Sequence, residues 1–178
     1  PTGLFPGAAA LWFAATTRGI IMVTATELQV RRDALGSIHA ATRELAAGPG
    51  EMLLRIERFA LTANNMTYAA HGVDMAYWGF FPAPEGFGIV PVWGFARVVE
   101  SHVDGIAAGD RFYGYWPMAS HAVVTPVKVS PRGFTDGAAH RAKLPPVYNN
   151  YVPASAAYGP ETVQALFRPL YTTSFVLD

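Results

Sequence analysis

The chain has 178 residues, 51% of them hydrophobic, and its 13 basic side chains balance 13 acidic ones. This length and composition suit one globular domain with a substantial core. A neutral chain without a basic cluster lacks the electrostatic footprint that polyanions attract, so we expect neither nucleic acid nor a membrane as a partner. The absence of cysteine excludes disulfides, thiolate nucleophiles and cysteine-containing zinc sites, and the scattered histidines predict no metal site.

The first residues look like a segment outside the domain. Residues 4–15 form an apolar run that is too short to span a bilayer, and no cationic region precedes it as in a signal peptide. The chain begins with Pro1, while a plausible start, Met22, lies inside. We therefore expect residues 1–25 to be a disordered leader or upstream read-through. The sequence stops in mid-pattern at Asp178, which predicts a fragment of a longer protein.

Alternating apolar and polar residues predict strands. Residues 27–32 alternate in this way, and residues 37–43 can return as the partner strand after a turn. The clearest strand covers residues 51–60. Further strands are expected at residues 93–101, 110–115, 119–125 and 127–130.

Two stretches lack a regular period. Residues 62–92 contain too many aromatic rings for a disordered linker, so we expect an ordered active-site loop with one helical turn. Residues 131–158 are expected to be mostly loop. The Gly-Pro-Glu at residues 159–161 is typical of a helix start. Pro169 is expected to kink or end that helix, with residues 170–178 beginning another.

Asn64 and Asn65 directly follow the clearest strand and are candidate ligand-binding residues. An asparagine amide offers a ligand both a hydrogen-bond donor and an acceptor without a change of charge. The alternative is an ordinary turn, because asparagine tolerates left-handed backbone and hydrogen-bonds to its own neighbourhood.

Four tyrosines form the second candidate set, because a phenol can donate a proton or a hydrogen bond to a developing enolate. The alternative is that each fills core space and leaves its hydroxyl at the rim of a barrel. These residues are Tyr68, Tyr77, Tyr113 and Tyr115. The glycine-rich turn at residues 105–111 is assigned to structure, and Asp110 within it is not expected to be catalytic.

Motifs that bind phosphates or activate a serine are missing. The sequence has no G-x-G-x-x-G, no G-x-x-x-x-G-K and no G-x-S-x-G. Without a glycine-rich turn that leads into a helix, nothing offers a cradle for a pyrophosphate. We therefore expect that the chain alone does not hold a dinucleotide tightly.

Taken in order, several segments resemble the N-terminal, GroES-like domain of the medium-chain dehydrogenases/reductases. Residues 51–56 (EMLLRI), after a Gly-Pro-Gly turn, are similar to that family's first long strand, and residues 105–114 (GIAAGDRFYG) to its GDRVyG segment. Residues 94–100 (GFARVVE) take the place of its G-x-E-x-x-G-x-V strand, with the central Glu and the second Gly replaced. More narrowly, an uncharacterised bacterial branch, domain of unknown function 2855, is similar at residues 93–96, 114–119, 144–149 and 172–175.

This resemblance implies a mainly β (α+β) fold. Residues 26–158 would form a GroES-like, partly open β-barrel with a few short helices, and residues 159–178 a helical connection to a Rossmann domain that the chain lacks. The chain would be the catalytic-domain fragment of a zinc-independent, cytoplasmic reductase that acts on a small apolar carbonyl, enone or quinone. NADP or NAD would be bound mainly by the missing domain, no metal is implied, and a homodimer is the expected full-length assembly.

The resemblance also implies roles for individual residues. Asn64 and Asn65 stand where related reductases place an asparagine beside the nicotinamide, and Tyr77, with Tyr68 as the alternative, stands near the proton donor of the enoyl-reductase branch. The expected catalytic residues are Tyr77, Tyr68 and Asn65, the cofactor-binding residues Asn64, Asn65, Thr172 and Thr173, and the substrate pocket Trp78, Phe80, Phe81, Tyr113 and Tyr115. The alternative is a non-catalytic GroES-like module that binds a hydrophobic ligand or a partner, which the substituted family positions suggest.

Overall fold

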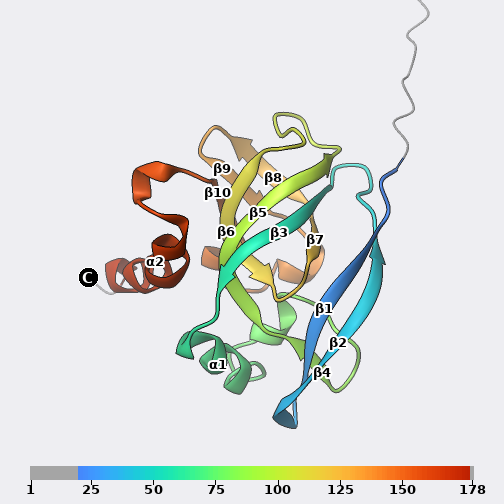
Figure 1. Ribbon diagram of the computed structural model, residues 1–178, viewed down its shortest axis with the longest axis vertical. Helices are drawn as coiled ribbons and strands as arrows, with labels where there is room; N and C mark the ends of the chain where they lie inside the picture. The colour runs from blue at the N-terminus through green and yellow to red at the C-terminus, as the bar shows by residue number, and fades with distance from the viewer. Residues whose placement is uncertain (1–19, 177–178) are drawn as a thin grey trace, which may run out of the picture.

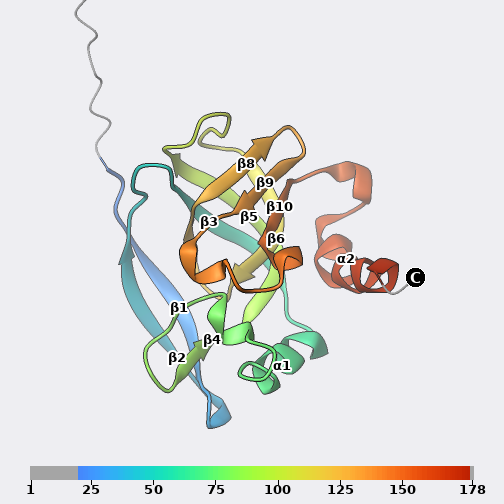
Figure 2. The same ribbon diagram turned by 180° about the vertical axis from the view of Figure 1, so that it is seen from behind.

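The computed structural model describes residues 20–176, with side chains described up to Tyr171. It opens with a hairpin of β1 (Val23–Arg31) and β2 (Ala34–Leu45), and β4 (Phe87–Ile89) pairs with the other edge of β1. Both views place this hairpin on the side of the molecule away from α2 (Glu161–Val176) (Figures 1 and 2). The predicted hairpin is confirmed, but residues 23–25 belong to it, whereas residues 1–19 of the expected leader lie outside the described part.

The alternation along β1 buries its polar side chains. Glu27 and Gln29 are 3% and 5% exposed, whereas Leu28 is 37% exposed. The two buried side chains are satisfied, because Gln29 Nε2 donates to Glu27 Oε2 at 3.2 Å and Arg43 on β2 lies 2.5 Å from Glu27 Oε1. A buried charge needs such a partner, so the register of this hairpin is fixed by polar contacts as well as by packing.

The main sheet has seven strands in the order β7-β3-β5-β6-β10-β9-β8. Its two edge strands, β7 and β8, are consecutive in the chain and are joined by Thr125 alone. The sheet must therefore curl until its edges meet, and it forms the partly open β-barrel that the sequence predicts (Figure 1). The strands are β3 (Met52–Ala60), β5 (Pro91–Ser101), β6 (Arg111–Pro117), β7 (His121–Val124), β8 (Pro126–Ser130), β9 (Gly133–Asp136) and β10 (Asn150–Pro153).

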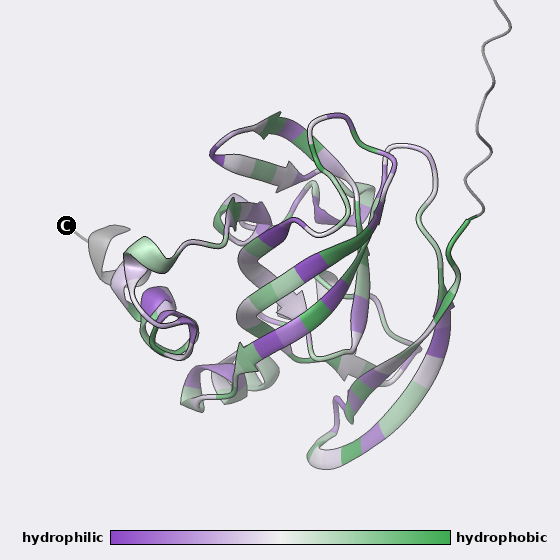
Figure 3. Ribbon diagram, turned by 45° about the horizontal axis from the view of Figure 1, so that its top comes forward, coloured by the Kyte–Doolittle hydropathy of each residue, from purple (hydrophilic) through white to green (hydrophobic). Residues whose placement is uncertain are grey.

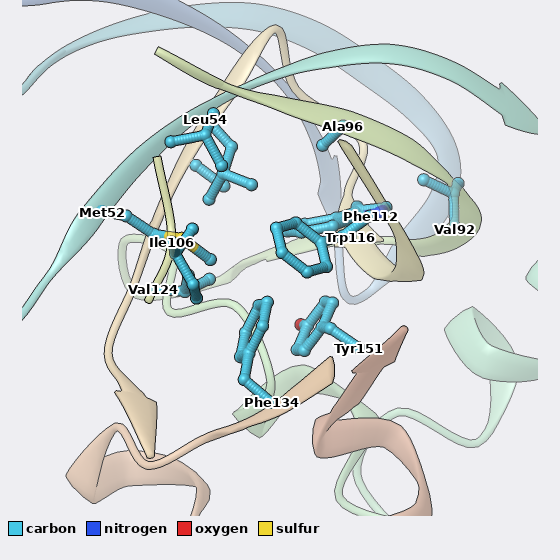
Figure 4. Close-up of a cluster of buried hydrophobic side chains, with 12 residues drawn as sticks. Met52, Leu54, Val92, Ala96, Ile106, Phe112, Trp116, Val124, Phe134 and Tyr151 are labelled. Atoms are coloured by element: carbon cyan, nitrogen blue, oxygen red, sulfur yellow. The ribbon is translucent and has the colours of Figure 1, made fainter. Parts of the chain in front are cut away.

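Hydrophilic and hydrophobic residues alternate along many of these strands (Figure 3), and the hydrophobic side of the curled sheet forms the barrel core. The rings of Trp116 and Tyr151 pack in a tilted arrangement at its centre, with centroids 4.5 Å apart (Figure 4). Trp116 Nε1 donates to Gly94 O at 3.1 Å. Gly94 itself lies against Arg58 O of β3, and an added Cβ would overlap that atom. The core residues labelled in Figure 4 are Met52, Leu54, Val92, Ala96, Ile106, Phe112, Trp116, Val124, Phe134 and Tyr151.

The outer face of β5 and β6 is also buried, because α1 (Ala63–Ala70), α2 and the segment after β9 cover it (Figure 2). Charged groups attach the start of α2 to the barrel. Arg111 donates to Glu161 Oε1 at 2.6 Å and to Glu57 Oε2 at 2.8 Å, and Arg97 donates to Glu57 Oε1 at 2.7 Å. Burial raises the pKa of the Glu57 carboxyl, but the hydrogen bonds from Arg97 and Arg111 outweigh burial and bring this pKa down to about 2.

Three predictions of secondary structure are wrong. Residues 62–92 hold the eight-residue helix α1 as well as β4, and residues 131–158 contain β9 and β10. The helix α2 continues through Pro169 and no second helix starts at residue 170. A proline inside a helix removes one hydrogen bond and crowds the carbonyl four residues earlier, but the packing of Ala165 against Phe95 and Tyr113 holds the preceding turn in place.

Candidate functional site

Asn65 lies at the start of α1, and its side chain makes hydrogen bonds that hold this end of the helix in place. Its Oδ1 accepts hydrogen bonds from Thr62 N at 2.6 Å and Thr62 Oγ1 at 3.2 Å, and its Nδ2 donates to Pro91 O at 2.8 Å. The side chain reaches back to the N-cap residue, as in a capping box, and it attaches the helix to β5. Asn65 is 2% exposed, whereas Asn64 beside it is only half-buried.

Tyr68 lies one turn further along α1, and its hydroxyl accepts a hydrogen bond from Trp93 Nε1 at 3.3 Å. An indole nitrogen can only donate, so the hydroxyl proton of Tyr68 is not used in this contact. Burial raises the pKa of the Tyr68 phenol above its ordinary value. The hydroxyl therefore stays protonated at neutral pH and can act as a hydrogen-bond or proton donor.

Tyr77 is 6% exposed, and its hydroxyl lies 3.2 Å from the hydroxyl of Tyr148. The Tyr148 ring contacts both Tyr77 and Tyr115, at centroid distances of 5.8 and 4.6 Å. Burial raises the pKa of Tyr148 and also that of Tyr115. Tyr148 is absent from the predicted site, and no periodic signal marks it, because its partners are far away in the sequence. We call the set Tyr68, Tyr77, Phe80, Phe81, Trp93, Tyr115 and Tyr148 the aromatic cluster.

A small pocket lies between α1 and α2, and we call it the Tyr68 pocket. One side of this pocket is lined by Asn64, Asn65, Tyr68 and Trp93. The candidate asparagines therefore lie beside two members of the aromatic cluster. Its volume is about 10 Å³, which is room for about one water molecule. Ala165, Leu166 and Pro169 of α2 close the other side.

The five residues predicted to wall a substrate pocket do not share one. Phe80 and Phe81 line a separate cavity of about 420 Å³, which is considered below. Trp78 packs with Val30, Ala69 and Val90, while Tyr113 packs with Phe95 and Ala165 under α2. Tyr115 is completely buried within the aromatic cluster.

Thr172 and Thr173, the other expected cofactor-binding residues, lie in α2, but their side chains are outside the described part of the structure. Within residues 20–176, no three His, Asp or Glu side chains gather closely enough to bind a metal ion. Over the same range, no helix has both the length and the apolar composition needed to cross a bilayer.

Comparisons with known proteins identify a family and similar solved structures. The family model of DUF2855, a protein of unknown function, matches residues 59–178. Among solved structures, the quinone oxidoreductase from Coxiella burnetii is similar, with 14% sequence identity and a TM-score of 0.33. That match covers 61% of this chain and 39% of the other, so the chain spans well under half the length of that protein. No curated protein matches.

Proposed function

The chain belongs to the DUF2855 family of proteins of unknown function, and from the Tyr68 pocket we propose that it is the substrate-binding part of an NAD(P)H-dependent reductase. The substrate class is a small apolar carbonyl, enone or quinone. The observation that supports this proposal most directly is a buried, protonated phenol whose oxygen accepts from Trp93 Nε1 and whose own proton has no acceptor among the residues that the structure describes.

The chemistry of the pocket suits reduction of a carbonyl group. A nicotinamide, when bound, supplies a hydride to the electrophilic carbon of the substrate. Tyr68 donates its hydroxyl proton to the substrate oxygen, and the Trp93 N–H stabilises the phenolate that remains. Tyr68 suits this role better than Tyr77, because the Tyr77 hydroxyl already pairs with that of Tyr148.

The polar groups of the Tyr68 pocket suit a nicotinamide, but the volume of the pocket is too small for one. The Asn64 amide lines the pocket and can pair with a carboxamide, while the amide of Asn65 is engaged with Thr62 and Pro91. A volume of about 10 Å³ admits no ring. Binding therefore requires Leu166 and Pro169 of α2 to move away from Trp93, and the nucleotide phosphates would be held outside this chain.

The test uses the full-length protein with NADPH and NADH, and follows nicotinamide absorbance with 1,4-benzoquinone, an enone and an aliphatic ketone as substrates. Tyr68→Phe keeps the ring and removes the proton, so we expect kcat to fall by roughly 10²- to 10⁴-fold with little change in KM. Tyr158→Phe is the matched control, since Tyr158 is 63% exposed and does not line the pocket. Failure of the full-length protein to bind or oxidise either nicotinamide would refute the proposal.

The small size of the Tyr68 pocket favours a second candidate, a non-catalytic module that binds a hydrophobic ligand or a partner. The same titration distinguishes the two. A module of this kind binds no nicotinamide at any concentration, and its Tyr68→Phe variant behaves like the parent protein in every assay.

A further inference from the structure

A second cavity lies on the other side of Phe80 and Phe81 and shares no lining residue with the Tyr68 pocket. It has a volume of about 420 Å³, which is in the range of small-molecule sites. The end of β2, the edge strand β7 and the segment after β9 enclose it. Its apolar wall includes Leu45, Phe80, Phe81, Pro82, Ile89 and Pro117.

One buried cation lines this cavity. Arg141, in the short 3-10 helix η2 (Ala139–Arg141), is 2% exposed. Its Nη1 donates to Tyr151 OH at 3.0 Å and, more weakly, to Asn149 Oδ1 at 3.4 Å. Its Nε lies 3.2 Å from Asp136 Oδ2 but makes no aligned hydrogen bond, and among the described residues no hydrogen bond is made by Nη2.

An unsatisfied guanidinium N–H in the interior is costly, so these nitrogens favour an acceptor in the cavity. The carboxylates nearby are already engaged. Asp136 Oδ1 accepts from Thr125 N and Ala138 N, and Glu51 Oε2 accepts from Gly48 N at 2.9 Å. These hydrogen bonds already hold one oxygen of each carboxylate, whereas Nη2 of Arg141 makes no hydrogen bond among the described residues and can donate to an anionic ligand.

The rings around Arg141 indicate the rest of the ligand. Its Cζ lies 4.8 Å from the Phe81 ring centroid and 5.6 Å from that of Phe80. A flat apolar body beside the guanidinium would contact these faces while its carboxylate reaches the N–H groups. Two imidazoles also line the cavity, but His140 Nε2 is paired with Phe80 O and His121 Nδ1 with Ser120 Oγ.

We propose that this cavity binds a small aromatic carboxylate, held by the Arg141 guanidinium at its charged end and by Phe80 and Phe81 along its ring. The site is separate from the Tyr68 pocket, so the inference goes beyond the proposed function and does not depend on it.

The probes are benzoate and its neutral analogue benzamide, each titrated into the full chain and followed by protein-observed NMR. Both have the same ring, and only benzoate can form the charge-assisted contact, so we expect benzoate to bind about tenfold more tightly. Arg141 is buried in an ion pair and its removal endangers the fold, so the ligand is varied in place of that residue.

Two alanine positions supply matched variants. Ala138→Phe places a ring in the cavity lining, and Ala142→Phe places the same ring on an exposed residue just past Arg141. We expect Ala138→Phe to weaken benzoate binding about tenfold or more, because it fills the space that the ligand uses, and Ala142→Phe to leave binding unchanged.

Equal affinities for the two probes would overturn the carboxylate assignment, and benzoate binding that survives Ala138→Phe would overturn the location. Absence of benzoate binding at millimolar concentration would reject the site altogether. Tyr68→Phe must leave the titration unaltered, so this test and the test of the reductase proposal fail independently.

Discussion

Tyr151→Phe removes a single oxygen from the middle of the barrel, and its cost can be worked out from two contacts. The hydroxyl donates to Tyr115 O at 2.7 Å and accepts from Arg141 Nη1 at 3.0 Å, and the residue is 1% exposed. The substitution keeps the ring, which stacks on Phe134 at 4.9 Å. Burial raises the pKa of this phenol to about 12, so it stays protonated throughout the usual range of denaturation experiments.

A neutral buried hydrogen bond contributes about 1 kcal/mol and one to a charged group about 2 kcal/mol, so we expect a loss of about 3 kcal/mol in the free energy of unfolding. For a domain of this size, that loss corresponds to a decrease in Tm of roughly 6–12 °C. Urea denaturation monitored by tryptophan fluorescence measures the change, provided that the m-value stays constant.

The matched control is Tyr158→Phe, which removes the same oxygen from a residue that is 63% exposed. We expect that variant to match the parent within about 0.5 kcal/mol. A loss below about 1 kcal/mol for Tyr151→Phe would show that the Arg141 and Tyr115 contacts do not hold the hydroxyl in solution, and the reasoning would be refuted.

Two further predictions concern the barrel wall. The pKa of Glu57 is lowered from 4.5 to about 2, because hydrogen bonds from Arg97 and other arginines outweigh the effect of burial. A lowered carboxyl pKa stabilises the fold above the unfolded pKa, and this stability is lost as pH falls from about 4.5 towards 2. Glu57→Gln should therefore flatten the pH dependence of the urea midpoint in that window, and an unchanged slope would contradict the assignment. Gly94→Ala should destabilise the fold by about 2 kcal/mol or more, because its Cβ would overlap Arg58 O. Gly36→Ala, with no neighbour within 4 Å, is the control, and equal urea midpoints for the two variants would contradict the argument.

The longer strands could be predicted because each has enough residues for a period to show. The hairpin and β3, β5 and β6 were located from their strand patterns, and the barrel was expected from the resemblance of these segments, taken in order, to a GroES-like domain. By contrast, β9 and β10 have four residues each. Segments this short lie between proline- and tyrosine-rich turns, and only their pairing partners identify them as strands.

The candidate site was only partly predictable for a similar reason. Asn64, Asn65 and Tyr68 do lie together, because they are close in sequence on one short helix. Asn65 reaches back to Thr62 in the place where a capping box has Glu or Gln, and this substitution hid the start of α1. Tyr148 reaches Tyr77 across 71 residues of chain, and no local pattern carries that contact.

The position of β10 within the sheet has a consequence for biosynthesis. This strand comes after β9 in the chain but lies between β6 and β9, so the hairpin of β8 and β9 has no link through the sheet to β6 until residues 150–153 are added. A nascent chain on the ribosome therefore exposes two unpaired strand edges at once, and such edges are templates for pairing between molecules. Slow addition of β10 to the sheet should favour inclusion bodies, whereas a chaperone that shields these edges should favour the native barrel.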